Sequence, residues 1–336
     1  MSRVTSTSSR LVAGTIAALV LAACSSVTDD ANTRSMTPTD PSLSRSAEFN
    51  PTRHEFHTKQ FYAGKPGGVG GGKSTGITYH GGTVIANPSV TKVVVIYWAP
   101  NQIYPLQPTG SGAGVNDNSL IGSFVNHLGG SSYFNINTTY YDAAGQHVQN
   151  AVQYTSYWST GGDVAGPSAS PTDANMISLI QAGITLGKIA YDPNTVYAIL
   201  TGTGVNLGGG FGSQYCAYHT RGTTSQGTAY YAAMPFNQQY PSACTSGLPS
   251  PNADVAGNSE VNTLAHEIEE TTTDARGNAW YDNRGYENAD KCAWTWGSTS
   301  TASNGGKYNM QFSDGKFYLV QQNWVNAGSG GCAKSY

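Results

Sequence analysis

Charge is scarce in this sequence. Of its 336 residues, 17 are Lys or Arg and 20 are Asp or Glu, which gives a formal net charge of −3. Nucleic acids and anionic membrane surfaces attract strongly basic proteins, so this balance argues for neither. Either kind of binding would need a local basic patch, and we expect no nucleic-acid partner.

The sequence also lacks closely spaced cysteines. Without a CxxC pair, a four-cysteine zinc site is excluded. If Cys24 is a lipid anchor, as argued below, an even number of cysteines remains. An even number in an exported chain favours disulfides. These four cysteines allow three pairings. Their order favours Cys216–Cys244 and Cys292–Cys332, because each pair closes a moderate local loop.

The N-terminal apolar run is too short to cross a bilayer. It extends from Leu11 to Ala23, follows Arg3 and Arg10, and ends in small residues, which is typical of an export signal. The junction "LAACS" around Cys24 resembles the bacterial lipobox, in which the cysteine is lipidated. We therefore predict a lipoprotein signal peptide over residues 1–23 and a location at the outer membrane or cell surface. The alternative is an ordinary signal peptide cut nearby.

Composition divides the rest of the chain. Residues 24–75 are rich in Ser, Thr, Asp, Pro and Gly and have few large apolar side chains, so they predict a disordered, lipid-anchored linker. The membrane would be contacted only through that anchor. Residues 76–336 have the composition and length expected of one globular domain.

Four apolar runs in the globular region predict strands. They are Lys92 to Pro100, Asn194 to Gly202, Thr228 to Phe236 and Lys316 to Trp324. The first two are uninterrupted, as in strands buried on both faces. Apolar residues at helical spacing predict helices over Ser119 to Leu128 and Asp173 to Leu186. The fold class expected is mixed α/β or α+β.

The stretch "LAHEIEETTTD", from Leu264 to Asp274, carries the candidate site. Its spacing resembles the HExxH motif of zinc peptidases, with Glu270 in place of the second histidine. A helix starting at a cap on Asn258 or Ser259 would put His266, Glu267 and Glu270 on the side opposite its apolar residues. This face is therefore either the solvated surface of a core-packed helix or a metal site.

Several features favour a metal. Side chains at i and i+4 lie side by side, so His266 and Glu270 can reach one cation. The helix concentrates carboxylates in a chain poor in charge. Downstream, Glu287 and Asp290 lie 17 and 20 residues beyond Glu270, and either could be the third ligand, as in zinc peptidases of the thermolysin kind. Glu267 would then be the general base.

Several motifs in order resemble one family. "TYHGG", "KVVVIYW", "VYAILTG", "CAYH" and "HEIEETTTDARGNAWYD…ENADKCAW" are similar to motifs of the Exordium, or phosphate-induced, protein family, over about residues 76–332. In that resemblance His266, Glu267 and Glu270 match HELAE, and Asp290 matches GDLC. His219 matches the histidine of CGFH, which makes it a further candidate ligand.

The resemblance implies a secreted, wall- or surface-associated protein. From the motif we add the expectation of an exported zinc-dependent hydrolase, a metallopeptidase acting on a peptide or protein. Its zinc ligands would be His266, Glu270 and Asp290, with Glu287 and His219 as alternates. The alternative is a non-catalytic protein that binds a surface glycan or protein through aromatic residues and uses a structural metal or salt-bridge site. The aromatic residues in question are Trp280, Tyr281, Trp294 and Trp296.

Overall fold

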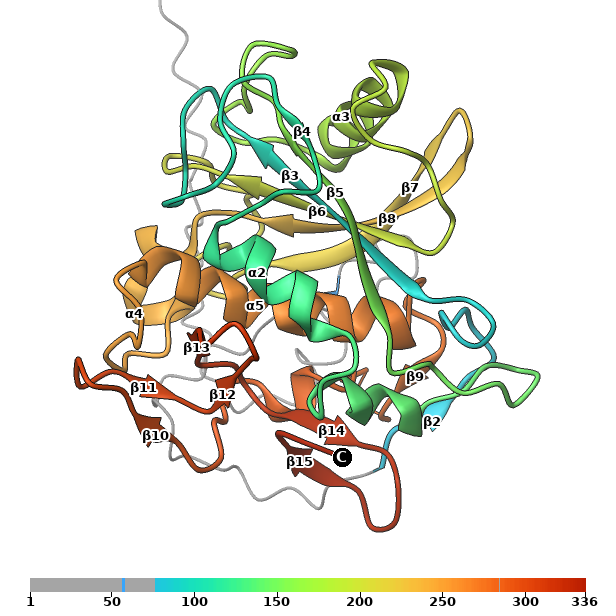
Figure 1. Ribbon diagram of the computed structural model, residues 1–336. Coiled ribbons are helices and arrows are strands. Elements are labelled where there is room, and N and C mark those ends of the chain that lie inside the picture. The colour runs from blue at the N-terminus through green and yellow to red at the C-terminus, as the bar shows by residue number, and fades with distance from the viewer. Residues whose placement is uncertain (1–55, 58–75, 284) are drawn as a thin grey trace, which may run out of the picture. The chain divides into compact units, whose positions relative to one another are not determined.

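The computed structural model describes residues 56–57, 76–283 and 285–336 (Figure 1). The predicted signal peptide, the lipidation site Cys24 and the predicted linker other than Phe56 and His57 lie outside these ranges. The described residues belong to one compact unit. Within them, no helix has both the length and the apolar character needed to cross a membrane.

A mixed sheet forms the centre of the fold, in the order β1-β7-β8-β6-β3-β5-β4. Strand β3 pairs in parallel with β5 and β6, and β6 pairs in parallel with β8. The remaining pairs, at the two edges, are antiparallel. The strands are β1 (Phe56–His57), β3 (Thr91–Trp98), β4 (Ala113–Gly114), β5 (Val152–Ser159), β6 (Thr195–Thr201), β7 (Tyr218–Thr224) and β8 (Gly227–Met234). The mixed α/β class predicted from the sequence is confirmed.

Strand β3 is buried on both faces, as its unbroken apolar run predicts. Val93 and Val95 point into the core shared with α2 (Leu120–Leu128) and α5 (Val255–Thr273). Val94 and Ile96, on the opposite face, pack into a second core with α3 (Asp173–Thr185). Alternate strand residues point to opposite faces, so a strand with helices on both sides must be apolar throughout.

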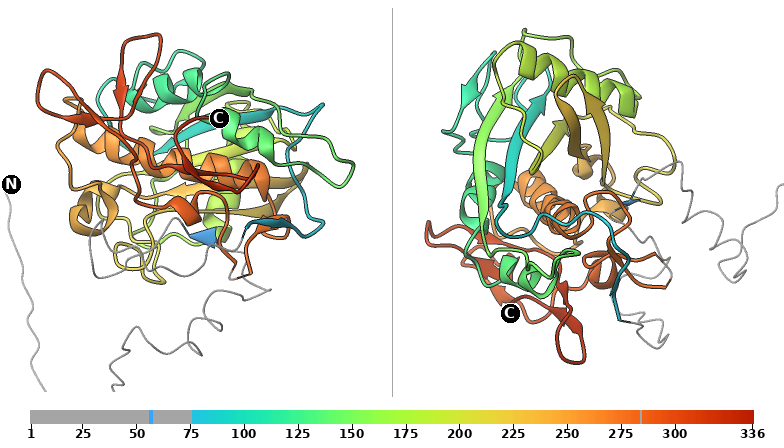
Figure 2. Two further views of the ribbon diagram at one scale, coloured as in Figure 1. Left: turned by 90° about the horizontal axis from the view of Figure 1, so that it is seen from below. Right: turned by 90° about the vertical axis from the view of Figure 1, so that its right-hand side faces the viewer.

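Helices cover the two faces of the sheet. Helix α3 lies on one face, and α2 and α5 lie on the other (Figures 1 and 2). The predictions of helices from Ser119 and from Asp173 are confirmed. Ser119 caps α2 by accepting a hydrogen bond from the Gly122 N–H. The short helical elements are η1 (Phe134–Thr139), η2 (Asn237–Gln239), α4 (Pro241–Cys244) and η3 (Asp290–Cys292).

Short strand pairs form outside the main sheet. β2 (Thr78–Tyr79) pairs with β9 (Trp280–Tyr281), β10 (Ser300–Thr301) with β11 (Lys307–Tyr308), β12 (Met310–Gln311) with β13 (Phe317–Tyr318), and β14 (Asn323–Val325) with β15 (Gly331–Ala333). Helix α5 lies between the main sheet and these C-terminal strands (Figures 1 and 2). A helix enclosed on two sides has little surface left for solvent.

The prediction of one strand from Lys316 to Trp324 is wrong. The run divides into β13 and β14, and the residues between them do not pair with a strand. The backbone N–H of Val320 instead donates to the Asn309 side chain, and that of Gln321 donates to the Asn262 side chain. Side chains take over the hydrogen bonds that a neighbouring strand would have provided.

Two disulfides tie loops to the framework. Cys216 pairs with Cys244 and Cys292 pairs with Cys332, with Cα–Cα distances of 5.4 and 5.5 Å. This is the pairing that cysteine order favours. The first links Cys216, two residues before β7, to α4, and the second links η3 to β15. Disulfides persist in oxidising compartments, so the pairs indicate an extracellular or otherwise oxidising location.

Candidate metal centre

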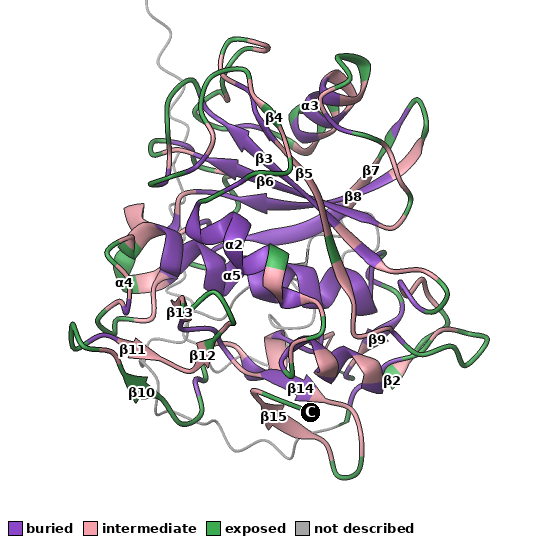
Figure 3. Cartoon of the chain, viewed as in Figure 1, coloured by how far each residue is buried: buried purple, intermediate pink, exposed green. Residues whose placement is uncertain are grey.

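The polar face of α5 is buried. His266, Glu267 and Glu270 have no exposed surface, and Figure 3 shows the helix enclosed along most of its length. The interpretation of this face as a solvated surface is therefore wrong. The segment around η3 and the chain at Gln321 and Asn323 cover it. Helical spacing shows which residues share a face, but not which distant segment packs on it.

The start of α5 also differs from the prediction. The helix begins at Val255, and Asp254 caps it by accepting a hydrogen bond from the Gly257 N–H at 2.8 Å. Asn258 and Ser259, the predicted caps, lie inside the helix. Asp is as good a cap as Asn or Ser, so an acceptable cap one turn earlier lengthens the helix and leaves the candidate residues in its second half.

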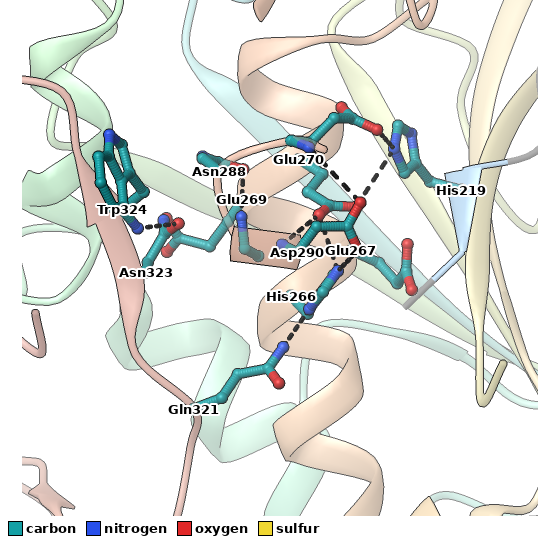
Figure 4. A network of polar contacts seen from close by, with 12 residues as sticks. His219, His266, Glu267, Glu269, Glu270, Asn288, Asp290, Gln321, Asn323 and Trp324 are labelled. Atoms are coloured by element: carbon teal, nitrogen blue, oxygen red, sulfur yellow. Dashed lines mark hydrogen bonds and ion pairs between the residues drawn. The ribbon is translucent and has the colours of Figure 1, made fainter. Parts of the chain in front are cut away.

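One group of candidate ligands converges at η3. His266 Nε2 lies 2.8 Å from Glu270 Oε1 and 3.5 Å from Asp290 Oδ1. The backbone N–H of Asp290 donates to Glu270 Oε1 at 3.0 Å, which holds η3 against α5. Figure 4 shows these side chains turned toward one another. The structure thus brings together the three residues predicted as zinc ligands.

A second group forms on the other side of Glu270. His219 Nε2 lies 3.6 Å from Glu270 Oε2 and 3.2 Å from Glu287 Oε2. His219 is the second residue of β7; its neighbour Tyr218 packs into the core on the α3 side, so His219 points toward α5. Both predicted alternates therefore lie at the site together with the three residues of the first group.

Glu267 lies beside both groups. Neither of its carboxylate oxygens makes a hydrogen bond of normal length to any described group, although the backbone N–H of His219 lies close enough to lower its pKa. The charges of His266 and Glu270 also act on it. A buried carboxylate without a firm partner, next to candidate ligands, is placed to accept a proton.

Burial is the common cause of the raised pKa values of the glutamates in the cluster. Burial raises the pKa of Glu267 and of Glu287 well above the usual range. Burial, together with Asp290, raises the pKa of Glu270 to about 7. Burial lowers the pKa of His266, but the carboxylates of Glu270 and Asp290 outweigh this effect and leave it well above its usual value. Among the described residues, carboxylates are crowded here with little positive charge beside them.

The residues present fit a divalent cation. In each group, the three ligand atoms lie within 4.8 Å of one another, and zinc at about 2.0 to 2.2 Å from each ligand needs ligand atoms in that range. Buried polar atoms are almost always hydrogen-bonded. Here Glu270 Oε2, Glu287 Oε1 and Asp290 Oδ1 have no hydrogen-bond partner in the described parts of the chain. A cation would supply the partner that they lack.

Sequence reasoning missed the amide side chains that surround the cluster. The Gln321 amide nitrogen contacts His266 Nδ1, and the Asn323 amide donates to Glu269 Oε2. A side-chain amide at this position orients a ligating imidazole when its oxygen faces Nδ1 and accepts the ring proton. The available signal was the polar stretch Gln321 to Asn323, which interrupts an apolar run. Polar residues within such a run indicate buried hydrogen-bond partners.

The aromatic residues near the acidic segment contribute mostly to packing. Trp280 and Trp296 are buried, and Tyr281 and Trp294 are half-buried. Tyr281 stacks on His80 with ring centroids 3.7 Å apart, beside the pairing of β2 with β9. Burial of Trp280 and Trp296 counts against a binding surface built on these two side chains, and Trp280 packs against Tyr79, Tyr140 and Tyr141.

Comparison with known families matches residues 77–333 to the phosphate-induced protein 1 conserved region. Searches of the curated proteins and of the solved structures returned no match. The matched range includes every residue of the candidate centre.

Proposed function

The chain belongs to the phosphate-induced protein 1 family, and we propose that this member is an exported zinc-dependent hydrolase. The proposed reaction is the hydrolysis of a peptide or protein. The zinc ligands are His266, Glu270 and Asp290, and Glu267 is the general base.

One observation carries this proposal. Three side chains from two separate elements direct Nε2 of His266, Oε1 of Glu270 and Oδ1 of Asp290 to one point. His266 and Glu270 are fully buried, and Asp290 is the only one of the three with an exposed side chain, at 9%. Among the described residues no Lys or Arg forms an ion pair with these three side chains, and carboxylates with an imidazole are a donor set suited to zinc.

The roles of the residues follow from their positions. A bound zinc ion supplies Lewis acidity, which makes a water molecule acidic enough to lose its proton near neutral pH. Glu267, which has no hydrogen bond of normal length to the described residues, accepts that proton and returns it to the leaving amine. With Nε2 on the cation, the His266 proton stays on Nδ1, so the Gln321 side-chain amide, which lies against Nδ1, would turn its oxygen there to accept that proton and orient the ring.

Export and surface attachment are part of the proposal. The two disulfides support folding in an oxidising compartment. The lipobox-like junction at Cys24 supports attachment through lipid, and zinc chemistry at a cell surface suits substrates outside the cell. Substitution of Cys24 by Ala in the full chain should release the protein from the membrane fraction without altering its metal content.

The zinc content of the protein tests the ligand assignment. Full-length protein purified without chelators should contain stoichiometric zinc by elemental mass spectrometry. The His266→Ala variant should lose it, because His266 provides the only imidazole of this group. Wild-type protein without any bound metal would overturn the proposal.

The Glu267→Gln variant tests catalysis. It should keep zinc and lose about 10²- to 10⁴-fold in turnover of a peptide library, because a general base but no ligand is removed. Glu269→Gln is the matched control, since Glu269 is equally buried on the same helix but faces Asn323. Equal turnover in wild type and Glu267→Gln would remove Glu267 from the mechanism.

The burial of the candidate ligands favours a second function. His266, Glu270 and Glu287 have no exposed surface, and a metal enclosed in this way suits a structural role in a surface protein that binds glycan or protein. In that case wild-type protein contains metal and unfolds at lower temperature without it, but cleaves no peptide in the library. The metal content and the turnover of the same preparation therefore separate the two functions.

A further inference from the structure

We propose that the centre holds two divalent cations, bridged by Glu270. The inference extends the proposed function, because it keeps His266, Glu270 and Asp290 as one site. It adds a second site formed by His219, Glu270 and Glu287. The cations are of the zinc class, since each site offers one imidazole and two carboxylates.

The two oxygens of Glu270 point to different partners. Oε1 lies 2.8 Å from His266 Nε2, and Oε2 lies 3.6 Å from His219 Nε2. Each histidine therefore shares Glu270 but approaches a different oxygen, as Figure 4 shows. A carboxylate used in this way bridges two cations about 3.5 to 4 Å apart.

Each site has its own third ligand. Asp290 Oδ1 lies 3.5 Å from His266 Nε2, and Glu287 Oε2 lies 3.2 Å from His219 Nε2. Both acids belong to one short segment, in which the Glu287 N–H and Asp290 Oδ2 are 3.5 Å apart. One packed segment thus supplies the third ligand of both sites. A centre with a single ion would need only one of these two acids.

The charge of the cluster favours two ions over one. Glu267, Glu270, Glu287 and Asp290 are four carboxylates, and three of them have no exposed surface. Among the described residues, no Lys or Arg forms an ion pair with them; Lys291, next to Asp290, pairs with Asp282 at 3.1 Å. When all four carboxylates are ionised, one divalent cation leaves two negative charges in a buried site, whereas two cations neutralise all four.

Buried oxygens without partners are present on both sides of the bridge. Asp290 Oδ1 lies at the first site, and Glu270 Oε2 and Glu287 Oε1 lie at the second, all without a hydrogen bond to described groups. If only the first site held an ion, Glu287 Oε1 would stay without a partner among the described groups, and Glu270 Oε2 would have only His219 Nε2 at 3.6 Å. Unpaired buried oxygens are costly, and a second cation removes that cost.

The test is the number of ions held by each variant. Full-length protein is saturated with zinc alone, freed of excess metal, and measured by elemental and native mass spectrometry. Wild type should hold two ions. His219→Gln should hold one, because the second site loses its imidazole, and Asp290→Asn should hold one, because the first site loses its acid. Glu260→Gln, which removes an equally buried carboxylate from the same helix, should hold two.

Manganese gives a second readout that does not depend on ion counts. Spins of two Mn²⁺ ions couple through a shared carboxylate, so the electron paramagnetic resonance spectrum of the wild type should be exchange-coupled. His219→Gln should give the spectrum of isolated Mn²⁺. Circular dichroism of each variant confirms folding, and Glu287→Gln replaces His219→Gln if the latter does not fold.

The outcomes are distinct. A wild type with one ion that Asp290→Asn loses and His219→Gln keeps would overturn the two-ion centre and leave the proposed function standing. One ion lost in both variants would mean a single shared site and would also overturn it. No ion in the wild type would overturn both proposals, with the cluster held by protons and ion pairs alone.

Discussion

The glutamates are the most unusual residues of this protein. Glu is almost never fully buried unless it is paired, yet every glutamate in the described ranges has no exposed surface: Glu260, Glu267, Glu269, Glu270 and Glu287. Two of them have neutral donors, because Glu260 accepts from the Asn237 N–H and Glu269 from the Asn323 amide. The other three surround the candidate centre, where cations would stabilise them.

Glu260 leads to a prediction about pH. Burial raises its pKa from the usual 4.5 to about 8, so between these values the folded protein holds a proton that the unfolded chain releases. The contribution of this group to stability therefore falls as pH rises from about 5 through 8. The Glu260→Gln variant should match wild type near pH 5 and exceed it by about 4 kcal/mol in free energy of unfolding at pH 9.

Urea denaturation of both proteins at several pH values measures this difference. Taking the difference between the two proteins cancels the titration of other groups, provided that they act independently of Glu260. A difference that stays constant from pH 5 to pH 9 would contradict the prediction, since it would mean that Glu260 does not titrate in this range.

At the scale of elements, α5 accommodates polar residues by bonding them to itself. The hydroxyls of Thr271 and Thr272 donate to the backbone carbonyls of Glu267 and Ile268, each at 2.7 Å. Thr273 donates to the Glu269 carbonyl at 3.2 Å. Such bonds satisfy buried hydroxyls without an outside partner. The last turn of α5 can therefore be buried without apolar side chains.

The ligand-bearing elements differ in how they are held. His219 lies in β7, which is paired with β8 along its length. Asp290 lies in η3, which is a single short turn joined to β15 by the Cys292–Cys332 disulfide. The position of Asp290 therefore depends on a disulfide, whereas that of His219 depends on a strand ladder.

Removal of each disulfide should distinguish the two cases. Cys292→Ala with Cys332→Ala should lower the free energy of unfolding by about 2 to 5 kcal/mol and weaken zinc binding at least about tenfold, because η3 loses its tie. The control is Cys216→Ala with Cys244→Ala, which should lose similar stability but keep zinc affinity. Calorimetry of zinc binding and of unfolding measures both effects.

The reverse pattern would contradict this account. If the Cys216–Cys244 pair, and not the Cys292–Cys332 pair, set the zinc affinity, the approach to β7 would be the weakly held element. Equal loss of affinity in both variants would mean that the centre responds to global stability alone.

At the scale of the whole molecule, the candidate centre joins segments that are distant in sequence. Helix α5 contributes His266 and Glu270, β7 contributes His219, and the segment at η3 contributes Glu287 and Asp290. The centre lies where α5 is enclosed between the main sheet and the C-terminal segments (Figure 2). A cation there would link the two sides, so its binding should be coupled to global folding.

Removal of metal should therefore lower the unfolding temperature. Zinc that binds only the folded state stabilises it by about 2.7 kcal/mol at a free concentration one hundred times Kd, which corresponds to roughly 5 to 10 °C in Tm for a domain of this size. Calorimetry with and without a chelator measures the shift, and His266→Ala should show a smaller one. Identical Tm values for wild type under both conditions would contradict metal-coupled folding.

Several features were determined by sequence alone, because they depend on local spacing. The unbroken apolar runs at β3 and β6 are typical of strands buried on both faces. The period of apolar residues fixes α2 and α3. The i, i+4 spacing brings His266 and Glu270 together on any helix, and the order of motifs indicates the family.

Only the tertiary structure decided what covers the polar face of α5. The half-exposed β5 and the polar strand β7 have too few apolar residues for a strand pattern. The position of His219 therefore followed only from the pairing of β7 with β8 in the sheet. The same is true of Gln321, whose backbone leaves the strand pattern to bond Asn262. The sequence offered Asp290, Glu287 and His219 as alternatives for one position, and the structure brings all three to the two oxygens of Glu270. Convergence of this kind depends on how distant segments pack, which residue spacing does not contain.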